Sequence, residues 1–148
     1  METRRTPFLP CKKILIVDDN VDCRMLQTIV ITRMGFEVIE ADNGASAINQ
    51  ALEAHPDLIL MDLGMPIMNG EDAIVQLKIH PSTRDIPVII CTAFGRGPRV
   101  DRARDGGAVE ILHKPFDFSE LQKLLQKHLS SELKAGAGRA VNVGVEQQ

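Results

Sequence analysis

Short, continuous apolar runs alternate with longer amphipathic stretches along this chain of 148 residues. The apolar runs lie at residues 14–17, 36–40, 57–61, 87–92 and 109–112. Runs without alternation of apolar and polar residues are typical of strands buried on both faces, as in a parallel sheet covered by helices. The pattern therefore predicts five such strands.

The stretches between and after these runs predict helices, at residues 21–34, 45–54, 70–79, 98–107 and 118–129. The first carries apolar residues at Met25, Ile29 and Val30 and ends at Gly35, a natural stop for a helix. The stretch 98–107 has few apolar residues and glycines on both sides, so we expect a short or mobile helix there. Strands alternating with helices predict an α/β, doubly wound parallel sheet, which binds ligands at the carboxyl ends of its strands.

Composition is that of one folded, soluble domain, with 44% hydrophobic and 25% charged residues. The net charge of −3 and the absence of Trp and Tyr argue against direct nucleic-acid binding, which needs a basic surface or stacking rings. No apolar run approaches the length that spans a bilayer, so we expect neither membrane insertion nor secretion. The domain is expected at residues 12–130, after an arm at 1–11 and before a flexible tail at 131–148.

The cysteines Cys11, Cys23 and Cys91 are odd in number and form no CxxC pair. Neither a disulfide framework nor a zinc site is indicated, and a reducing, cytoplasmic location fits best. Cys91 lies within an apolar run and is expected to be inert.

Two adjacent carboxylates, Asp18 and Asp19, directly follow the first predicted strand. Two charges about 4 Å apart repel by up to about 4 kcal/mol at an effective dielectric constant near 20, so a cation should compensate them. The alternative is an acidic turn in which Asp19 or Asn20 caps the following helix. The pair alone leaves both interpretations open.

Asp62 follows the third predicted strand, within the sequence MDLGMPIMNG. Three carboxylates at neighbouring strand ends make an oxygen-rich pocket suited to Mg²⁺, which also binds phosphate oxygens. Asp62 could be a metal ligand only, or a nucleophile that accepts a phosphoryl group. Pro66 and Gly70 bend the loop and would leave the carboxylate facing the pocket.

Thr92 and Lys114 end the fourth predicted strand and follow the fifth. The Thr92 hydroxyl could donate to a phosphoryl oxygen, although a strand-end threonine bonded to backbone is the more ordinary interpretation. The Lys114 ammonium could both neutralise the carboxylates and hold a phosphate. Pro115 makes the Lys114–Pro115 bond a candidate for the cis form. His113, and a group of methionines near Asp62, are expected to be solvated and packed, respectively, rather than functional.

These motifs resemble the receiver domain of two-component response regulators, over about residues 12–129. The resemblance is carried by LIVDDN, MDLGMP, CTA, GGA and HKPF, with 30 residues between Asp62 and Thr92 and 22 between Thr92 and Lys114. This spacing is close to that of stand-alone, chemotaxis-type regulators. The resemblance implies a flavodoxin-like sheet with strand order 2-1-3-4-5.

The resemblance also implies the chemistry. Asp62 would accept a phosphoryl group from a sensor histidine kinase or phosphotransfer protein, and Thr92 and Lys114 would contact that group. Mg²⁺ would be held by Asp19, Asp62 and the Gly64 carbonyl, with Asp18 acting through water. Phosphorylation would then switch binding to a downstream protein target, through residues 94–107, the last strand and the last helix.

The chain departs from the receiver pattern at three positions. Ile111 occupies the place of an aromatic switch residue, so we expect Thr92 and the backbone to carry the conformational shift. Gly64 and Phe94 flank the pocket without a polar side chain to orient water, which predicts a long-lived phosphorylated state.

Two functions are alternatives to a phosphorylated receiver domain. One is a Mg²⁺-dependent phosphatase of the haloacid dehalogenase type, and the other is a pseudo-receiver that binds a partner without phosphorylation.

Overall fold

The computed structural model describes residues 11–93 and 95–130. Its strands are β1 (Lys13–Val17), β2 (Glu37–Ala41), β3 (Leu58–Met61), β4 (Val88–Thr92) and β5 (Glu110–His113). Its helices are α1 (Val21–Arg33), α2 (Gly44–Ala54), α3 (Gly70–Ile79), α4 (Pro98–Asp105) and α5 (Phe118–Leu125), which continues into the π-helical turn η1 (Gln126–Ser130). All pairings are parallel and the strand order is β2-β1-β3-β4-β5. The predicted fold class and strand order are confirmed.

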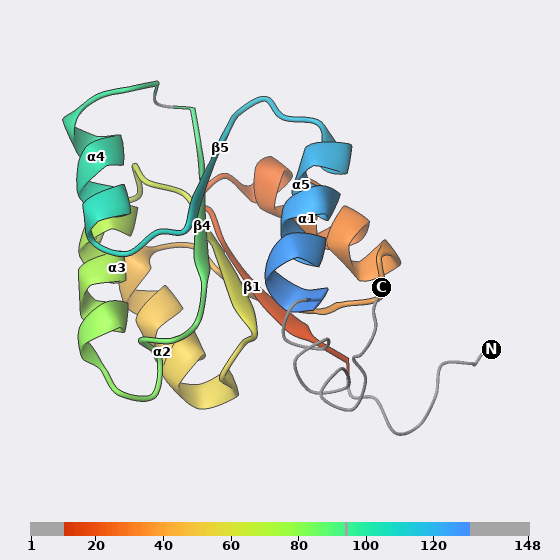
Figure 1. Cartoon of the computed structure of the whole chain (residues 1–148), viewed down its shortest axis with the longest axis horizontal. Coiled ribbons are helices and arrows are strands. Elements are labelled where there is room, and N and C mark those ends of the chain that lie inside the picture. The colour runs from red at the N-terminus through yellow and green to blue at the C-terminus, as the bar shows by residue number, and fades with distance from the viewer. Residues whose placement is uncertain (1–10, 94, 131–148) are drawn as a thin grey trace, which may run out of the picture.

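Helices cover both faces of the sheet, with α2, α3 and α4 on one side and α1 and α5 on the other (Figure 1). Each side has its own buried apolar cluster, because the strands contribute side chains to both in alternation. Every residue of β3 and β4 is buried. Burial on both faces explains why these strands showed no alternation of apolar and polar residues in the sequence.

Most element boundaries differ from the predicted ones by one or two residues, but α1 differs in a more informative way. The predicted apolar positions Met25 and Ile29 are 54% and 44% exposed, whereas Gln27 and Ile31 are buried. The periodicity identified the helix but not the face that packs on the sheet. In the last helix the buried face is apolar, since Leu121 and Leu125 are buried, as is Leu129 within η1.

The expected arm at 1–11 and tail at 131–148 fall almost wholly outside the described residues, so those boundaries stay predictions. Among the residues that the structure does describe, no helix is both long and apolar enough to cross a membrane.

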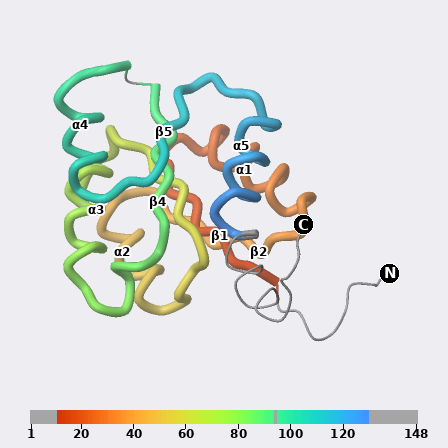
Figure 2. The backbone as a smooth tube through the Cα atoms, viewed as in Figure 1, coloured from red at the N-terminus to blue at the C-terminus, as the bar shows by residue number. Residues whose placement is uncertain are grey.

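The parallel arrangement brings the connections that follow the strands to one edge of the sheet, as the backbone path shows (Figure 2). The β3–α3 loop is fixed there by close backbone contacts. The Gly70 amide donates to the Leu63 carbonyl at 2.8 Å, and the Gly44 amide donates to the Met68 carbonyl at 2.8 Å. This loop follows Asp62, so its fixed path determines where the Asp62 side chain lies.

Candidate functional site

Asp18 is the buried anchor of the site, with 1% of its surface exposed at the end of β1. Its Oδ1 accepts a hydrogen bond from the Asn20 amide at 2.9 Å. Its Oδ2 accepts from Lys114 Nζ at 2.7 Å and from Gln27 Nε2 at 3.4 Å. These donors satisfy a carboxylate that burial would otherwise make costly.

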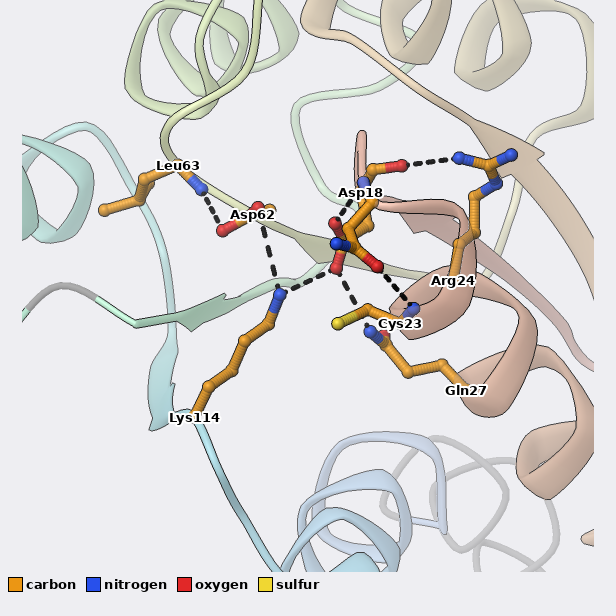
Figure 3. A network of polar contacts seen from close by, with 8 residues as sticks. Asp18, Cys23, Arg24, Gln27, Asp62, Leu63 and Lys114 are labelled. Carbon is orange, nitrogen blue, oxygen red and sulfur yellow. Dashed lines mark hydrogen bonds and ion pairs between the residues drawn. The ribbon is translucent and has the colours of Figure 1, made fainter.

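Lys114 bridges two of the carboxylates, as expected for a compensating cation (Figure 3). Its Nζ lies 3.8 Å from Asp62 Oδ2 as well as 2.7 Å from Asp18. Its backbone amide donates to the Thr92 carbonyl at 2.8 Å, which ties it to the end of β4, and the Lys114–Pro115 bond is cis. Burial alone would lower the pKa of Lys114, but the hydrogen bond to Asp18 and the charge of Asp62 raise it overall.

Asp62 follows β3, and its backbone amide donates to the Val17 carbonyl at 2.9 Å. Its Oδ1 accepts from the Leu63 amide at 2.9 Å, which orients the carboxylate and leaves Oδ2 facing Lys114. Burial raises the pKa of Asp62; the Lys114 ammonium opposes this effect and the Asp18 charge adds to it. The group is therefore a half-buried carboxylate held beside one cation and two other acids.

Asp18, Asp19 and Asp62 each place one carboxylate oxygen within 4.8 Å of the others. Such a cluster of hard oxygen ligands fits Mg²⁺, which takes one or two carboxylates and keeps several waters. Asp19 is exposed and can reach an ion that retains its water ligands. Gly64 lies exposed two residues after Asp62, and the metal-binding role of its carbonyl remains an expectation.

The acidic turn after β1 provides both a helix cap and a carboxylate cluster, from different residues. Asn20 caps α1, since its Oδ1 accepts from the Cys23 amide at 2.9 Å, while Asp18 and Asp19 belong to the cluster. The cap is therefore supplied without using either carboxylate.

Thr92 is fully buried at the end of β4, the strand beside β3, and its backbone carbonyl accepts from the amide of Lys114, which follows β5. Ile111 is half-buried against the apolar cluster under α2, α3 and α4. Phe94 lies outside the described residues, so the expectation that it flanks the pocket stays a prediction.

The burial of three kinds of side chain agrees with the expectation that His113 is solvated, that the methionines near Asp62 are packed and that Cys91 is inert. His113 is exposed, and Met61 and Met65 are buried within the core. Burial raises the pKa of the Cys91 thiol to about 12, which keeps it in the unreactive thiol form.

Sequence reasoning missed two polar residues of α1 that support Asp18. Gln27 donates to its carboxylate, and Arg24 Nη1 donates to its backbone carbonyl at 2.8 Å while Arg24 Nε contacts Glu40 at 2.9 Å. Gln27 lies one helical turn before the buried Ile31, on the face of α1 that packs on the sheet, and no signal in the sequence marked that face.

A second missed feature lies between α3 and α4. Glu71 is buried, with 2% of its surface exposed, and accepts from Arg99 at 2.7 and 3.2 Å and from Arg102 at 3.2 Å. Burial alone would raise the pKa of Glu71, but the Arg99 hydrogen bond and the two arginine charges lower it overall. We call this group the Glu71 clamp.

Comparison with known proteins gives consistent matches. The model of the response regulator receiver domain matches residues 14–126. Chemotaxis protein CheY of Thermotoga maritima is 41% identical over 118 residues, which cover 78% of this chain and 96% of that protein. Sporulation initiation phosphotransferase F of Bacillus subtilis is 34% identical over 118 residues, covering 80% and 94%. The receiver domain of sensor histidine kinase PA1611 from Pseudomonas aeruginosa, solved with a magnesium ion in its active site cleft, superimposes with a TM-score of 0.77 at 27% identity, covering 82% and 99%.

Proposed function

Because the chain belongs to the response regulator receiver domain family, we propose that it accepts a phosphoryl group on Asp62 and thereby switches its binding to a partner protein. The observation that carries the proposal is the placement of Lys114 between Asp62 and Asp18 at the strand ends. One oriented carboxylate, one cation and two further acids are the parts that phosphoryl transfer to a carboxylate requires.

In the proposed reaction, a carboxylate oxygen of Asp62 attacks the phosphorus of a phosphohistidine on a kinase or phosphotransfer protein. The new O–P bond forms as the N–P bond breaks, and the electron pair of that bond returns to the imidazole nitrogen. The Lys114 ammonium opposes the rise in the pKa of Asp62 that burial causes, and it meets the charge of the incoming phosphoryl oxygens, while Thr92 donates its hydroxyl to one of them. Mg²⁺ held by Asp19, Asp62 and the Gly64 carbonyl, with Asp18 through water, would supply further positive charge against these oxygens.

The partner that brings the phosphohistidine must reach the edge of the sheet where Asp62 lies. Helix α1 begins at this edge and exposes four apolar side chains, Val21, Met25, Leu26 and Ile29. Exposed apolar side chains beside a reactive group favour docking of another protein. A histidine-bearing partner that packs on α1 would lie next to the carboxylate, and a cytoplasmic location is part of the same proposal.

The test is intact-mass spectrometry after incubation with phosphoramidate, a small donor with an N–P bond, and Mg²⁺. We expect the wild type to gain one phosphoryl group and Asp62→Asn to gain none. Asp85→Asn is a matched control, because Asp85 is exposed and precedes β4, at the opposite edge of the sheet. Full labelling of Asp62→Asn would refute the assignment, and an unlabelled wild type would favour the pseudo-receiver alternative.

A chelator should abolish labelling in the same assay if the metal is required. The phosphatase alternative predicts instead the release of phosphate from added phosphomonoesters, with no stable mass increase. The match of the receiver domain model over residues 14–126 and the receiver strand order argue against that alternative.

A further inference from the structure

We propose that Arg99, near the start of α4, is a further phosphoryl-binding residue, whose guanidinium group turns from Glu71 toward a phosphoryl group on Asp62. The proposal rests on the proposed function, because it concerns the same carboxylate. None of the motifs that carry the receiver resemblance contains Arg99 or Glu71. Before phosphorylation, the buried Glu71 carboxylate holds this cation beside the site.

The first turns of α3 and α4 place Arg99 at the edge of the sheet that carries Asp62. The two helices lie side by side and follow the neighbouring parallel strands β3 and β4 (Figure 1). Gly70 opens α3 directly against Asp62, because a Cβ atom there would collide with the Asp62 carbonyl oxygen. Glu71 is the next residue, and it accepts from Arg99 Nε at 2.7 Å and from Arg99 Nη2 at 3.2 Å. The guanidinium group is therefore held next to the backbone that positions Asp62.

Arg99 already responds to the charge of Asp62. The hydrogen bond to Glu71 is the main reason why the pKa of Arg99 is raised, and burial opposes this effect. The charge of Glu71 and, more weakly, the charge of Asp62 add to the rise. A phosphoryl group brings a charge of about −1.5 to −2, so its attraction for the guanidinium group should exceed that of the carboxylate. Arginine also matches phosphate geometrically, through two parallel hydrogen bonds.

Glu71 can release Arg99 without losing every partner. Arg102 Nη2 also donates to its carboxylate, at 3.2 Å, and this contact need not change. A guanidinium group carries five N–H donors, so it can bind two acidic groups at the same time during the exchange. The Arg99 side chain is 34% exposed, which leaves it room to turn. The exchange therefore costs only part of the Glu71 clamp.

The charge at the site gives a reason for a second protein cation. Lys114 is the one ammonium group in contact with Asp18 and Asp62 among the described residues, and phosphorylation adds negative charge beside it. Arg102 is poorly placed to help, because it lies three residues further along α4, about 4.5 Å from Arg99 along the helix axis and away from the strand ends. Arg99 and Arg102 thus share one carboxylate but differ in their access to Asp62.

The first experiment uses this difference, in the phosphoramidate assay on the full chain. Arg99→Gln should slow the labelling of Asp62 about five- to tenfold, as for the loss of a charge-assisted hydrogen bond, and Arg99→Lys should slow it less. Arg102→Gln is the matched control, since it removes the same charge and also breaks a contact with Glu71. Equal slowing by Arg99→Gln and Arg102→Gln would mean that loss of the clamp is the cause, and would overturn the proposal.

The second experiment follows the phosphoryl group itself by ³¹P NMR, in a pH titration at steady state with phosphoramidate. A nearby cation favours the dianion and so lowers the pKa of the phosphoryl group. We expect Arg99→Gln to raise that pKa and Arg102→Gln to leave it unchanged. A residue that only fixes α4 would not change it. The same phosphoryl pKa in the wild type and both variants would therefore also overturn the proposal.

The third experiment tests the exchange with Glu71 by a double-mutant cycle. Glu71→Gln weakens the hold on Arg99, so it should speed labelling and lower the phosphoryl pKa. Both effects should vanish when Arg99→Gln is present as well, because they are transmitted through Arg99. Effects of Glu71→Gln that persist without Arg99 would be those of the Glu71 charge alone, and the exchange would be wrong.

The outcomes separate this proposal from the proposed function. A wild type that gains no phosphoryl group refutes the proposed function and the role of Arg99 together. A wild type labelled on Asp62, with Arg99→Gln equal to it in labelling rate and in phosphoryl pKa, refutes the role of Arg99 and leaves the proposed function intact.

Discussion

At the scale of single residues, the position of Asp62 depends on a glycine eight positions later in the chain. A Cβ atom built on Gly70 would lie 2.1 Å from the Asp62 carbonyl oxygen, a contact that real Cβ atoms do not make. Because the obstacle is backbone, no side-chain rotation can relieve it. The absence of a side chain at Gly70 is therefore a condition for the observed path of the β3–α3 loop.

We predict that Gly70→Ala lowers the free energy of unfolding by about 1–3 kcal/mol, the usual cost of overpacking, and slows labelling of Asp62 by more than tenfold. Urea unfolding and the phosphoramidate assay measure the two effects. Gly95→Ala is the control, since a Cβ atom at Gly95 would meet nothing within 4 Å. Comparable losses in both variants would show that the contact with Asp62 is not the cause.

At the scale of elements, the Glu71 clamp joins the first turn of α3 to α4. Helix α4 has eight residues and buries only Val100 and Ala103, so its apolar contacts are few. Its N-cap residue, Gly97, provides no side-chain cap. Ion pairs to a buried carboxylate thus supply a large part of what fixes this helix, although one partner, Arg102, is itself 60% exposed.

We predict that Glu71→Gln lowers the free energy of unfolding at pH 7 by about 1–3 kcal/mol, as for the loss of charge-assisted hydrogen bonds to a buried group. The folded-state pKa of Glu71 is lowered, so this stabilisation is present above the ordinary glutamate pKa and disappears as the pH falls through the folded-state value. The difference between wild type and variant should therefore shrink in acid.

The control for the clamp is Glu40→Gln, which removes a carboxylate that also pairs with an arginine but is 45% exposed. Exposed pairs contribute at most about 1 kcal/mol, so this variant should change stability little. Urea titrations from neutral to acidic pH provide the comparison. A difference for Glu71→Gln that stays constant with pH would contradict the role assigned to its charge.

The elements also show where sequence reasoning succeeds and where it stops. The sheet could be predicted because continuous apolar runs fit only strands buried on both faces, and the acidic cluster followed because parallel strands end at one edge. The packed face of α1 could not be predicted. Apolar residues lie on both sides of this helix, and burial of Gln27 depends on its hydrogen bond to Asp18, which is a tertiary contact.

The Glu71 clamp was beyond prediction for a similar reason. Glu71 and Arg99 are 28 residues apart, and their contact depends on how α4 lies against α3. An acidic residue in the first turn of a helix looks like an ordinary exposed position that favours the helix dipole. Only the packing of the two helices shows that this carboxylate is buried.

At the scale of the whole molecule, the site concentrates charge that folding alone does not neutralise. Three carboxylates, Asp18, Asp19 and Asp62, have one ammonium group, Lys114, in direct contact with two of them. Three negative charges and one positive charge leave an excess of two, on a chain whose net charge is −3. Their mutual repulsion is relieved on unfolding, so the site lowers the stability of the native state until a cation binds.

We therefore predict that Mg²⁺ raises the melting temperature of the wild type, because an ion that binds only the native state adds about 2.7 kcal/mol when its concentration is a hundred times its dissociation constant. Asp19→Asn should melt higher than the wild type without metal, and should gain less from Mg²⁺. Asp22→Asn is the matched control, since Asp22 is exposed in the first turn of α1 but is not part of the cluster. Removing its charge should leave the gain from Mg²⁺ unchanged. Thermal melts across a magnesium titration decide the matter, and an equal gain in all three proteins would mean that the ion binds elsewhere than at the three carboxylates.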